Sequence, residues 1–148
     1  MKRAWLAATL AILFLPPLLF GQTKKISPKA RAAAAARITR GRYLVEQVGM
    51  CGDCHTPRNN RGEAIEEQWL QGASLTFKPI EPAPVWIDKA PNIAGLPGWE
   101  KDAAIKYFMT GIGRNGLPGG RPPMPRYRFN EADAEAITAY LKSLALAK

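Results

Sequence analysis

The residues most capable of chemistry lie together in one short stretch, Met50-Cys51-Gly52-Asp53-Cys54-His55. Cys51 and Cys54 are the only cysteines in the chain, and His55 is its only histidine. The order C-x-x-C-H is typical of a c-type haem attachment site. Each thiol can add to one vinyl group on the same edge of a porphyrin, and the imidazole that follows can bind the iron as proximal ligand. The motif therefore predicts covalently bound haem, with Cys51 and Cys54 as attachment points and His55 as a metal ligand.

Three other chemistries use a pair of cysteines at this spacing. A redox dithiol would need a thioredoxin-like βαβ pattern around it, and the sequence shows none. A zinc site needs four ligands, and no further Cys or His completes nitrogen and sulfur coordination. A short-loop disulfide suits an exported chain but gives no role to His55. Haem explains all three residues, and the other readings stay open as weaker alternatives.

The N-terminal segment has the pattern of a secretory signal. A basic head, Met1-Lys2-Arg3, precedes an almost unbroken apolar run over residues 4–20, which a proline pair interrupts. The run is slightly short for a membrane-spanning helix. Gly21 offers a small residue for cleavage, but Leu19 does not fit a cleavage motif, so an uncleaved anchor is the alternative. We expect residues 1–21 to be a signal peptide or an N-terminal membrane anchor, and the protein to be exported to the periplasm.

The basic excess of the chain is confined to its N-terminal part. Of the 21 basic residues, two lie in the signal, seven lie between residues 24 and 42, and twelve share residues 43–148 with all twelve acidic residues. Beside a membrane this basic segment would favour anionic headgroups; on an Ala-rich helix it would form a solvated face. Because the chain is exported and shows no nucleic-acid module, we expect no nucleic-acid partner. Residues 22–37 are interpreted as a basic, Ala-rich helical extension ahead of a domain over residues 38–148.

Two helices are predicted around the cysteine motif. The first begins with Ser27 at the N-cap and Pro28 at the first helical position, and it reaches Gly49 as its C-cap. Further on, residues 63–70 predict a short helix. Gly41 within the first helix is unfavourable by about 1 kcal/mol relative to alanine, which a close helix crossing would explain. Residues at helical spacing predict the apolar face of this helix: Gly41, Leu44, Val45 and Val48.

Two more helices are predicted in the second half of the chain. One covers residues 100–110, and the last begins after Asn130, with Asp133 at the capping-box position. The stretches at 73–98 and 111–129 are rich in proline and glycine. Irregular stretches of this length are uncommon in a compact domain unless something else organises them, and a porphyrin would do so. The last helix has the predicted apolar face Ile137, Tyr140, Leu141 and Leu144.

The order of these motifs resembles class I, monohaem cytochrome c. The resemblance runs from about residue 38 to 146 and includes CGDCH, a long loop with APNIAG, a Gly/Pro-rich loop with PPMP, and a last helix ending in AITAYLKSL. It is greatest with the cytochrome c domains that accompany periplasmic dehydrogenases. The resemblance implies an all-α cytochrome c fold, in which three to four helices and long Gly/Pro-rich loops wrap around one haem c. It also implies that the first and last helices cross near Gly41 and Tyr140.

The resemblance also implies roles for residues outside the cysteine motif. Met124 would be the distal metal ligand, and the carbonyl group of Pro91 would accept a hydrogen bond from His55. Trp99 and Tyr127 would pack around the haem, although an ordinary place in the core would suit them nearly as well. Four arginines near Met124 would pair with haem propionates, face an acidic partner or lie in solvent: Arg114, Arg121, Arg126 and Arg128.

The residues themselves also favour Met124 as the distal ligand. No second histidine is available, and Met50 adjoins Cys51 on the attachment side. Met109 falls within the predicted 100–110 helix, where a core position is the simpler reading. Met124 lies between two prolines, which restrict the backbone and reduce the entropy lost when the thioether is held in place.

With both axial positions filled, the iron would have no open site for a substrate. A His/Met pair keeps the iron six-coordinate and raises its potential relative to His ligation alone. We therefore expect a single-electron carrier between periplasmic or membrane-bound redox partners, such as a dehydrogenase or a terminal oxidase, and not an enzyme. A haem-bearing relay subunit of a dehydrogenase or oxidase complex is the alternative. A haem enzyme or gas sensor is less favoured, because it would need a vacant distal position.

Overall fold

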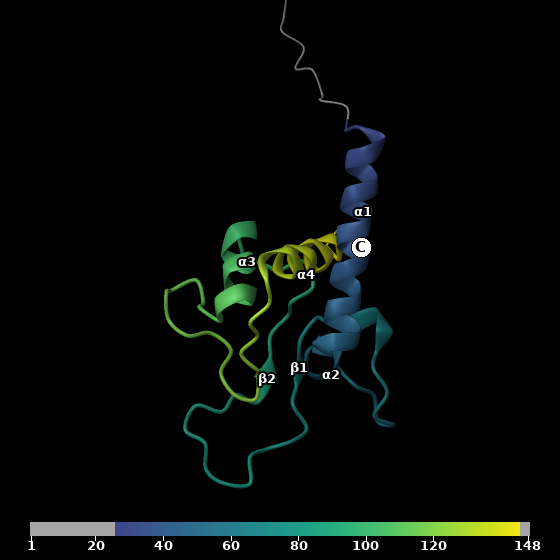
Figure 1. The fold of residues 1–148 in the computed structure, drawn as a ribbon. Coiled ribbons are helices and arrows are strands. Elements are labelled where there is room, and N and C mark those ends of the chain that lie inside the picture. The colour runs from purple at the N-terminus through teal and green to yellow at the C-terminus, as the bar shows by residue number, and fades with distance from the viewer. Residues whose placement is uncertain (1–25, 146–148) are drawn as a thin grey trace, which may run out of the picture.

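The computed structural model describes residues 26–145, which form four α-helices joined largely by irregular loops (Figure 1). The predicted signal or anchor at residues 1–21 and the start of the basic extension lie outside the described residues. Between residues 26 and 145, no helix combines the length and apolar character needed to cross a bilayer. The elements in chain order are α1 (Pro28–Tyr43), the π-helical segment η1 (Leu44–Val48), α2 (Cys51–His55), the 3₁₀ turn η2 (Glu66–Gln68), β1 (Ala73–Ser74), β2 (Lys89–Ala90), α3 (Lys101–Thr110) and α4 (Glu131–Ser143).

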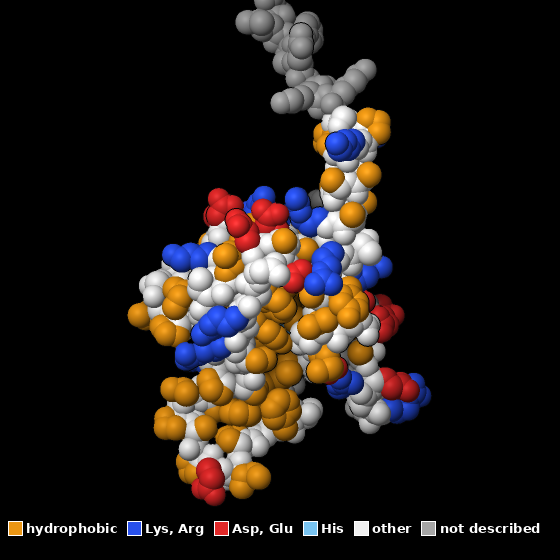
Figure 2. Space-filling model, viewed as in Figure 1, with side chains coloured by type: hydrophobic (Ala, Val, Ile, Leu, Met, Phe, Trp, Pro, Cys, Tyr) orange, Lys and Arg blue, Asp and Glu red, His pale blue; other side chains and the backbone are white. Residues whose placement is uncertain are grey.

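Helix α1 begins where its capping residues predict. The Ser27 hydroxyl accepts a hydrogen bond from the backbone N–H of Ala30 at 3.2 Å, and Pro28 occupies the first turn. The first part of the helix, up to residue 37, is exposed and extends beyond the body of the protein (Figures 1 and 2). Two arginines nearer the body form ion pairs with α4: Arg37 with Glu135 at 3.4 Å and Arg40 with Asp133 at 2.9 Å. Part of the basic excess therefore stabilises the helix packing.

The end of this helix differs from the prediction. The last turn is the π-helix η1, in which the backbone N–H of Gly49 bonds to the carbonyl of Leu44, five residues earlier, at 2.7 Å. The wider turn rotates Val48 off the buried face, so Val48 is 48% exposed while Leu44 and Val45 are buried. The prediction of Val48 as a core residue was wrong for this reason. Met50, with φ at 46°, takes the left-handed conformation that reverses the chain before the cysteines.

Helices α1 and α4 cross at Gly41, as the sequence predicts (Figure 1). A Cβ atom added at Gly41 would lie 1.9 Å from the carbonyl oxygen of Ala136 and 2.8 Å from the Cβ of Tyr140. No L side chain fits at that separation, so glycine is required by the close approach of two backbones. The lower helix propensity of glycine at position 41 is therefore the free-energy cost of packing the two helices this closely.

The N-terminus of α4 is capped differently from the predicted capping box. The side chain of Asn130 accepts a hydrogen bond from the backbone N–H of Asp133 at 2.9 Å, as expected of an N-cap. The Asp133 carboxylate does not reach back to the backbone of Asn130. Instead it accepts two hydrogen bonds from Arg40, at 2.9 and 3.2 Å, and one from the side-chain amide of Asn130. The guanidinium group of Arg40, on α1, therefore satisfies the Asp133 carboxylate with two charge-assisted hydrogen bonds.

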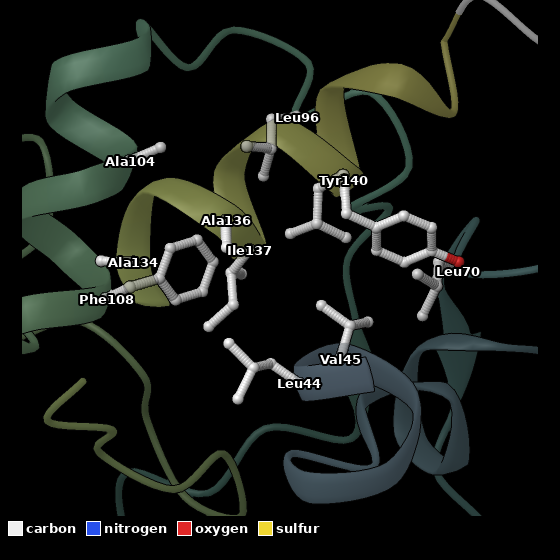
Figure 3. Packing of buried hydrophobic residues seen from close by; sticks show 11 residues of the cluster. Leu44, Val45, Leu70, Leu96, Ala104, Phe108, Ala134, Ala136, Ile137 and Tyr140 are labelled. Carbon is white, nitrogen blue, oxygen red and sulfur yellow. The ribbon is translucent and has the colours of Figure 1, made fainter. Parts of the chain in front are cut away.

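The hydrophobic core lies where α1, η1, α3 and α4 meet (Figure 3). From α4 it includes Ile137, Tyr140 and Leu141, which are at most 3% exposed. Leu144, the fourth member of the predicted face, is only partly buried. The figure shows side chains of η1, α3 and α4 pointing toward one another. The buried members of the hydrophobic core are Leu44, Val45, Leu70, Leu96, Ala104, Phe108, Ala134, Ala136, Ile137, Tyr140 and Leu141.

The predicted helix over residues 63–70 is not formed. Ala64 makes an isolated antiparallel bridge with Arg58, and Ile65 is extended, so only the single turn η2 follows. Leu70 then takes a left-handed conformation, with φ at 58°, and is fully buried. A helix through this stretch could not place Leu70 in the core in that conformation, so tertiary packing overrides the local preference.

The predicted irregular stretch over residues 73–98 is irregular apart from one short strand pair. Strands β1 and β2 are antiparallel, with Ala73 opposite Ala90 and Ser74 opposite Lys89. The chain between them forms a projecting loop that carries many apolar side chains (Figures 1 and 2). The strand pair brings Pro91 to the site described below.

Replacing Gly41 tests the helix crossing. We expect Gly41→Val to lower the free energy of unfolding by about 3 kcal/mol, near the upper end of ordinary overpacking, because the backbone of α4 must move. The exposed residue Ala33, on the same helix, offers a matched control. Ala33→Val should cost less than about 0.7 kcal/mol, through helix propensity alone. Urea unfolding of both variants measures the difference, and equal effects would contradict the crossing.

Candidate functional site

A single cavity of about 1080 Å³ brings together every site residue that the sequence singles out. Its walls come from α2, the loop between β1 and β2, the loop after β2, α3, the loop between α3 and α4, and α4 itself. Met109, the alternative distal ligand, does not line the cavity and packs against the core. The predicted residues on its wall are Cys51, Cys54, His55, Pro91, Trp99, Met124 and Tyr127.

His55 is held in one orientation and one tautomer. The residue is only 4% exposed, and Nδ1 of its ring lies 2.7 Å from the carbonyl oxygen of Pro91. Because a carbonyl oxygen can only accept, Nδ1 carries the proton and donates it to Pro91. Nε2 therefore keeps its lone pair, which a metal ion needs. Burial lowers the pKa of His55, which further favours the neutral ring.

A short segment that the sequence analysis missed ties His55 to the Pro91 loop. The backbone N–H of Leu70 donates to the buried hydroxyl of Thr56 at 3.0 Å, and that of Gly72 donates to the carbonyl of His55 at 2.7 Å. The carbonyl of Leu70 in turn accepts the N–H of Ile93 at 2.9 Å. These bonds join the end of α2 to the loop that follows Pro91, and the pairing of Ala73 with Ala90 holds the residue before it. No local sequence pattern marks this role, because the partners are far apart in the chain.

Trp69 supports the attachment helix from outside. A Cβ atom at Gly52, between the two cysteines, would lie 2.3 Å from the indole ring of Trp69. The indole N–H donates to the hydroxyl of Tyr140 at 3.3 Å, and that hydroxyl donates to the Glu46 carboxylate at 2.5 Å. The glycine in the motif therefore gives the indole room to pack on α2, and the hydrogen bonds tie the indole to α4 and η1.

The two thiols are poor candidates for a redox dithiol. Cys51 and Cys54 are free thiols in the structure. Burial raises the pKa of Cys51 to about 11, and burial also raises the pKa of Cys54. Redox-active dithiols work through a thiolate whose pKa is lowered by nearby positive charge or a helix N-terminus. The site shows the opposite shift, so the dithiol alternative loses support.

The loop that carries Met124 is connected to the attachment side. The backbone N–H of Met124 donates to the carbonyl of Arg121 at 3.0 Å. The hydroxyl of Tyr127 donates to the carbonyl of Gly49 at 2.7 Å, just before the cysteine motif. Burial raises the pKa of Tyr127 to about 12, so the hydroxyl stays protonated and keeps this bond across the physiological range. Tyr127 thus has a structural role besides lining the cavity.

The cavity fits a large, flat, mainly apolar cofactor. Its volume lies at the upper limit of the range of about 300–1000 Å³ for small-molecule sites. Two thiols and a neutral imidazole with a free Nε2 line one part of its wall, and a thioether lies on a separate loop. Sulfur and imidazole nitrogen are the ligands that haem iron takes in c-type proteins. The donor set and the space therefore suit a covalently attached haem.

Comparison with known proteins gives the same result. Residues 38–145 match the family model for cytochrome c. One relative is the cytochrome c subunit of an alcohol dehydrogenase (quinone) from Gluconobacter oxydans, 29% identical over 89% of this chain and 27% of the relative. Another is a diheme cytochrome c-type protein from Cereibacter sphaeroides, 34% identical over 70% of this chain and 34% of the relative.

A third relative is the fructose dehydrogenase cytochrome subunit of Gluconobacter japonicus, 32% identical over 71% of this chain. The chain spans only 21% of that relative, and about a third or less of the other two. The match therefore concerns one cytochrome domain within longer proteins. Together with the cavity and its donor set, the family match shows that this chain belongs to the cytochrome c family, whose members bind haem c covalently.

Proposed function

We propose that this chain is a single-electron carrier with one covalently bound haem c, ligated by His55 and Met124. The observation that carries the proposal is the buried His55 ring, whose Nδ1 bonds to Pro91 and whose Nε2 is left free, in a cavity that Met124 also lines. The haem, when bound, supplies reversible one-electron redox chemistry at its iron. One haem is proposed because the sequence contains only two cysteines and one histidine.

The chain's own residues hold the cofactor and keep its surroundings constant. The Pro91 carbonyl fixes the tautomer of His55, and the bonds around Leu70 fix the position of Pro91. Buried apolar side chains on the cavity wall, such as Leu96 and Phe108, exclude water and lower the local polarity. With a ligand from each of two separate segments, the site offers no coordination position for a substrate.

The partners are proposed from the relatives. Two of those named above are cytochrome subunits of dehydrogenases. We infer that a periplasmic or membrane-bound dehydrogenase or terminal oxidase exchanges electrons with this chain, as a free carrier or as a relay subunit of a complex. The predicted export signal or anchor at residues 1–21 supports the same compartment. The domain proposed to carry this function covers residues 38–148, behind the helical extension.

Covalent attachment is the first test of this proposal. Protein produced in cells with haem-attachment machinery should keep its colour on the polypeptide after denaturation and acid–organic extraction. The Cys51→Ala/Cys54→Ala variant, produced in the same cells, should release any haem it holds into the organic phase. Extraction of the haem from the wild-type chain would refute the two thioether bonds.

The distal ligand is the second test. In Met124→Ala the oxidised protein should lose the weak thioether-to-iron charge-transfer band, bind cyanide or CO readily and show a lower reduction potential. Met109→Leu is the matched control, because Met109 packs against the core and does not line the cavity. It should keep the band, and its reduced form should not bind CO, as expected of an electron carrier with both axial positions filled. If the two variants exchange these properties, the ligand assignment is wrong.

A further inference from the structure

The projecting loop between β1 and β2 presents apolar side chains to solvent at its tip (Figure 2). Ile80 is 100% exposed, Val85 is 56% exposed and Phe77 is 46% exposed. None of these three lines the cavity, although Leu75 and Ile87, nearer the strands, do. A cofactor that fills the cavity therefore covers the base of the loop and leaves its tip in water. Large apolar side chains gathered on a surface in this way are typical of binding sites.

The tip of this loop is held by contacts within the loop and at its base. The ring of Trp86 packs edge-on against the ring of Phe77, with 5.8 Å between the centroids. The backbone N–H of Trp86 donates to the carbonyl of Ala83 at 3.0 Å, and that of Ile87 donates to the carbonyl of Pro122 at 2.9 Å. Three prolines in the loop restrict its backbone further. A loop that is already ordered loses less conformational entropy on binding, which suits the tip to docking.

Hydrocarbon is an unsuitable environment for this tip. Over residues 76–85, no backbone N–H has a hydrogen-bond partner among the described residues. In water these groups bond to solvent, but inside a bilayer each of them would be left unpaired. Glu81, next to Ile80, adds a carboxylate that forms no ion pair within residues 26–145. A protein surface can supply acceptors for the N–H groups, so a protein is the better occupant.

Positive charge lies beside the base of the loop. The bond from Ile87 to Pro122 joins the base to the segment between α3 and α4, which has four arginines and no acidic residue over residues 111–130. All four arginines are exposed, and none forms an ion pair in the described part of the chain. The β1–β2 loop itself adds one basic and two acidic residues, so the combined surface stays positive. The four are Arg114, Arg121, Arg126 and Arg128.

A second copy of the chain does not complement this surface. In a two-fold symmetric contact the same patch lies on both sides of the interface, so the arginines of one copy would face those of the other. Like charges brought together in an interface are unfavourable. The surface that fits is instead one with an apolar recess for the tip and acidic side chains around that recess.

We propose that the tip of the β1–β2 loop docks in an apolar recess of a different protein, whose acidic border faces the arginines between α3 and α4. The role of this protein as the electron-exchange partner rests on the proposed function. Burial of Ile80 in the recess slows dissociation, as expected of an apolar side chain at the centre of an interface. The arginines at the border speed the encounter of the two proteins.

The experiment begins by capturing the partner through the tip. A photo-activated benzoylphenylalanine replaces Ile80 in the full chain, produced with its haem in the organism that encodes it. The control carries the same group in place of Ile26, an isoleucine that is 62% exposed and lies just before α1. We expect a protein adduct from position 80 that position 26 does not give. An adduct with lipid alone, an adduct with a second copy of the chain alone, or no adduct at position 80 would overturn the inference.

The captured protein is then purified, and its affinity is measured for the haem-loaded wild type, Ile80→Ser and Ile26→Ser. Both substitutions remove an exposed isoleucine side chain. Ile80→Ser should raise the Kd about tenfold, as expected when one aliphatic side chain is no longer buried. Ile26→Ser should leave the Kd unchanged. Equal values of Kd for the two variants would show that the captured protein does not dock on the tip.

The dependence of binding on salt tests the acidic border. The Kd of the wild type should rise with ionic strength, because salt screens the attraction between the arginines and the border, and Ile80→Ser should keep the same dependence. A Kd that is constant or falls with added salt would contradict an acidic partner. Electron exchange between the haem and the captured protein is followed in the same samples. Docking through the tip without electron exchange would refute the proposed function and leave the docking surface intact.

Discussion

The structure depends on a cavity of about 1080 Å³ that the protein's own side chains leave open. The protein core lies on one side of it, where α1 and α4 cross and α3 packs against α4. The cavity wall is completed by long loops with little secondary structure of their own. Such loops lose much conformational entropy on folding, and only the free energy of buried contacts can offset that loss. A covalently attached porphyrin supplies a single large apolar surface against which these loops can be buried.

A small set of hydrogen bonds positions the two residues that we propose as iron ligands. His55 is fixed by one bond to Pro91, and Pro91 is fixed through Leu70, which bonds to Thr56 and Ile93. The Met124 loop is joined to the attachment side by the bond from Tyr127 to Gly49. Each bond links segments that are distant in sequence, so the site is assembled by tertiary structure and is not carried by one element. In the proposed site, this placement of His55 and Met124 suits electron transfer, since the site then changes little between the two oxidation states.

Residues with strict local requirements could be predicted from the sequence. The spacing of Cys51, Cys54 and His55 predicts covalent attachment of haem. The prolines beside Met124 predict that the thioether of this residue is held in place. Ser27, Asn130 and Gly41 were predictable because caps and close crossings allow few residue types. All of these lie where expected, although the ligand roles of His55 and Met124 stay predictions.

The features that could not be predicted depend on tertiary contacts. The π-helical turn that exposes Val48 depends on how η1 connects to the cysteine motif. No periodic pattern in the sequence predicts this turn. Residues 63–70 have helical character, yet Leu70 must be buried in a left-handed conformation. Asp133 fits a capping box by spacing, but its carboxylate accepts hydrogen bonds from Arg40 of α1 instead. The packing of Trp69 on Gly52 likewise joins residues that no local rule connects.

The central claim is that haem completes the core of this domain, and unfolding without haem tests it most directly. The Cys51→Ala/Cys54→Ala variant, prepared free of haem, should be compared with the haem-loaded wild type by circular dichroism during urea unfolding. The account predicts a sharp transition for the wild type and a gradual, non-cooperative loss of helical signal for the variant, because the cavity leaves the loops without contacts. A sharp transition in the haem-free variant, from a state with native-like helix content, would contradict it.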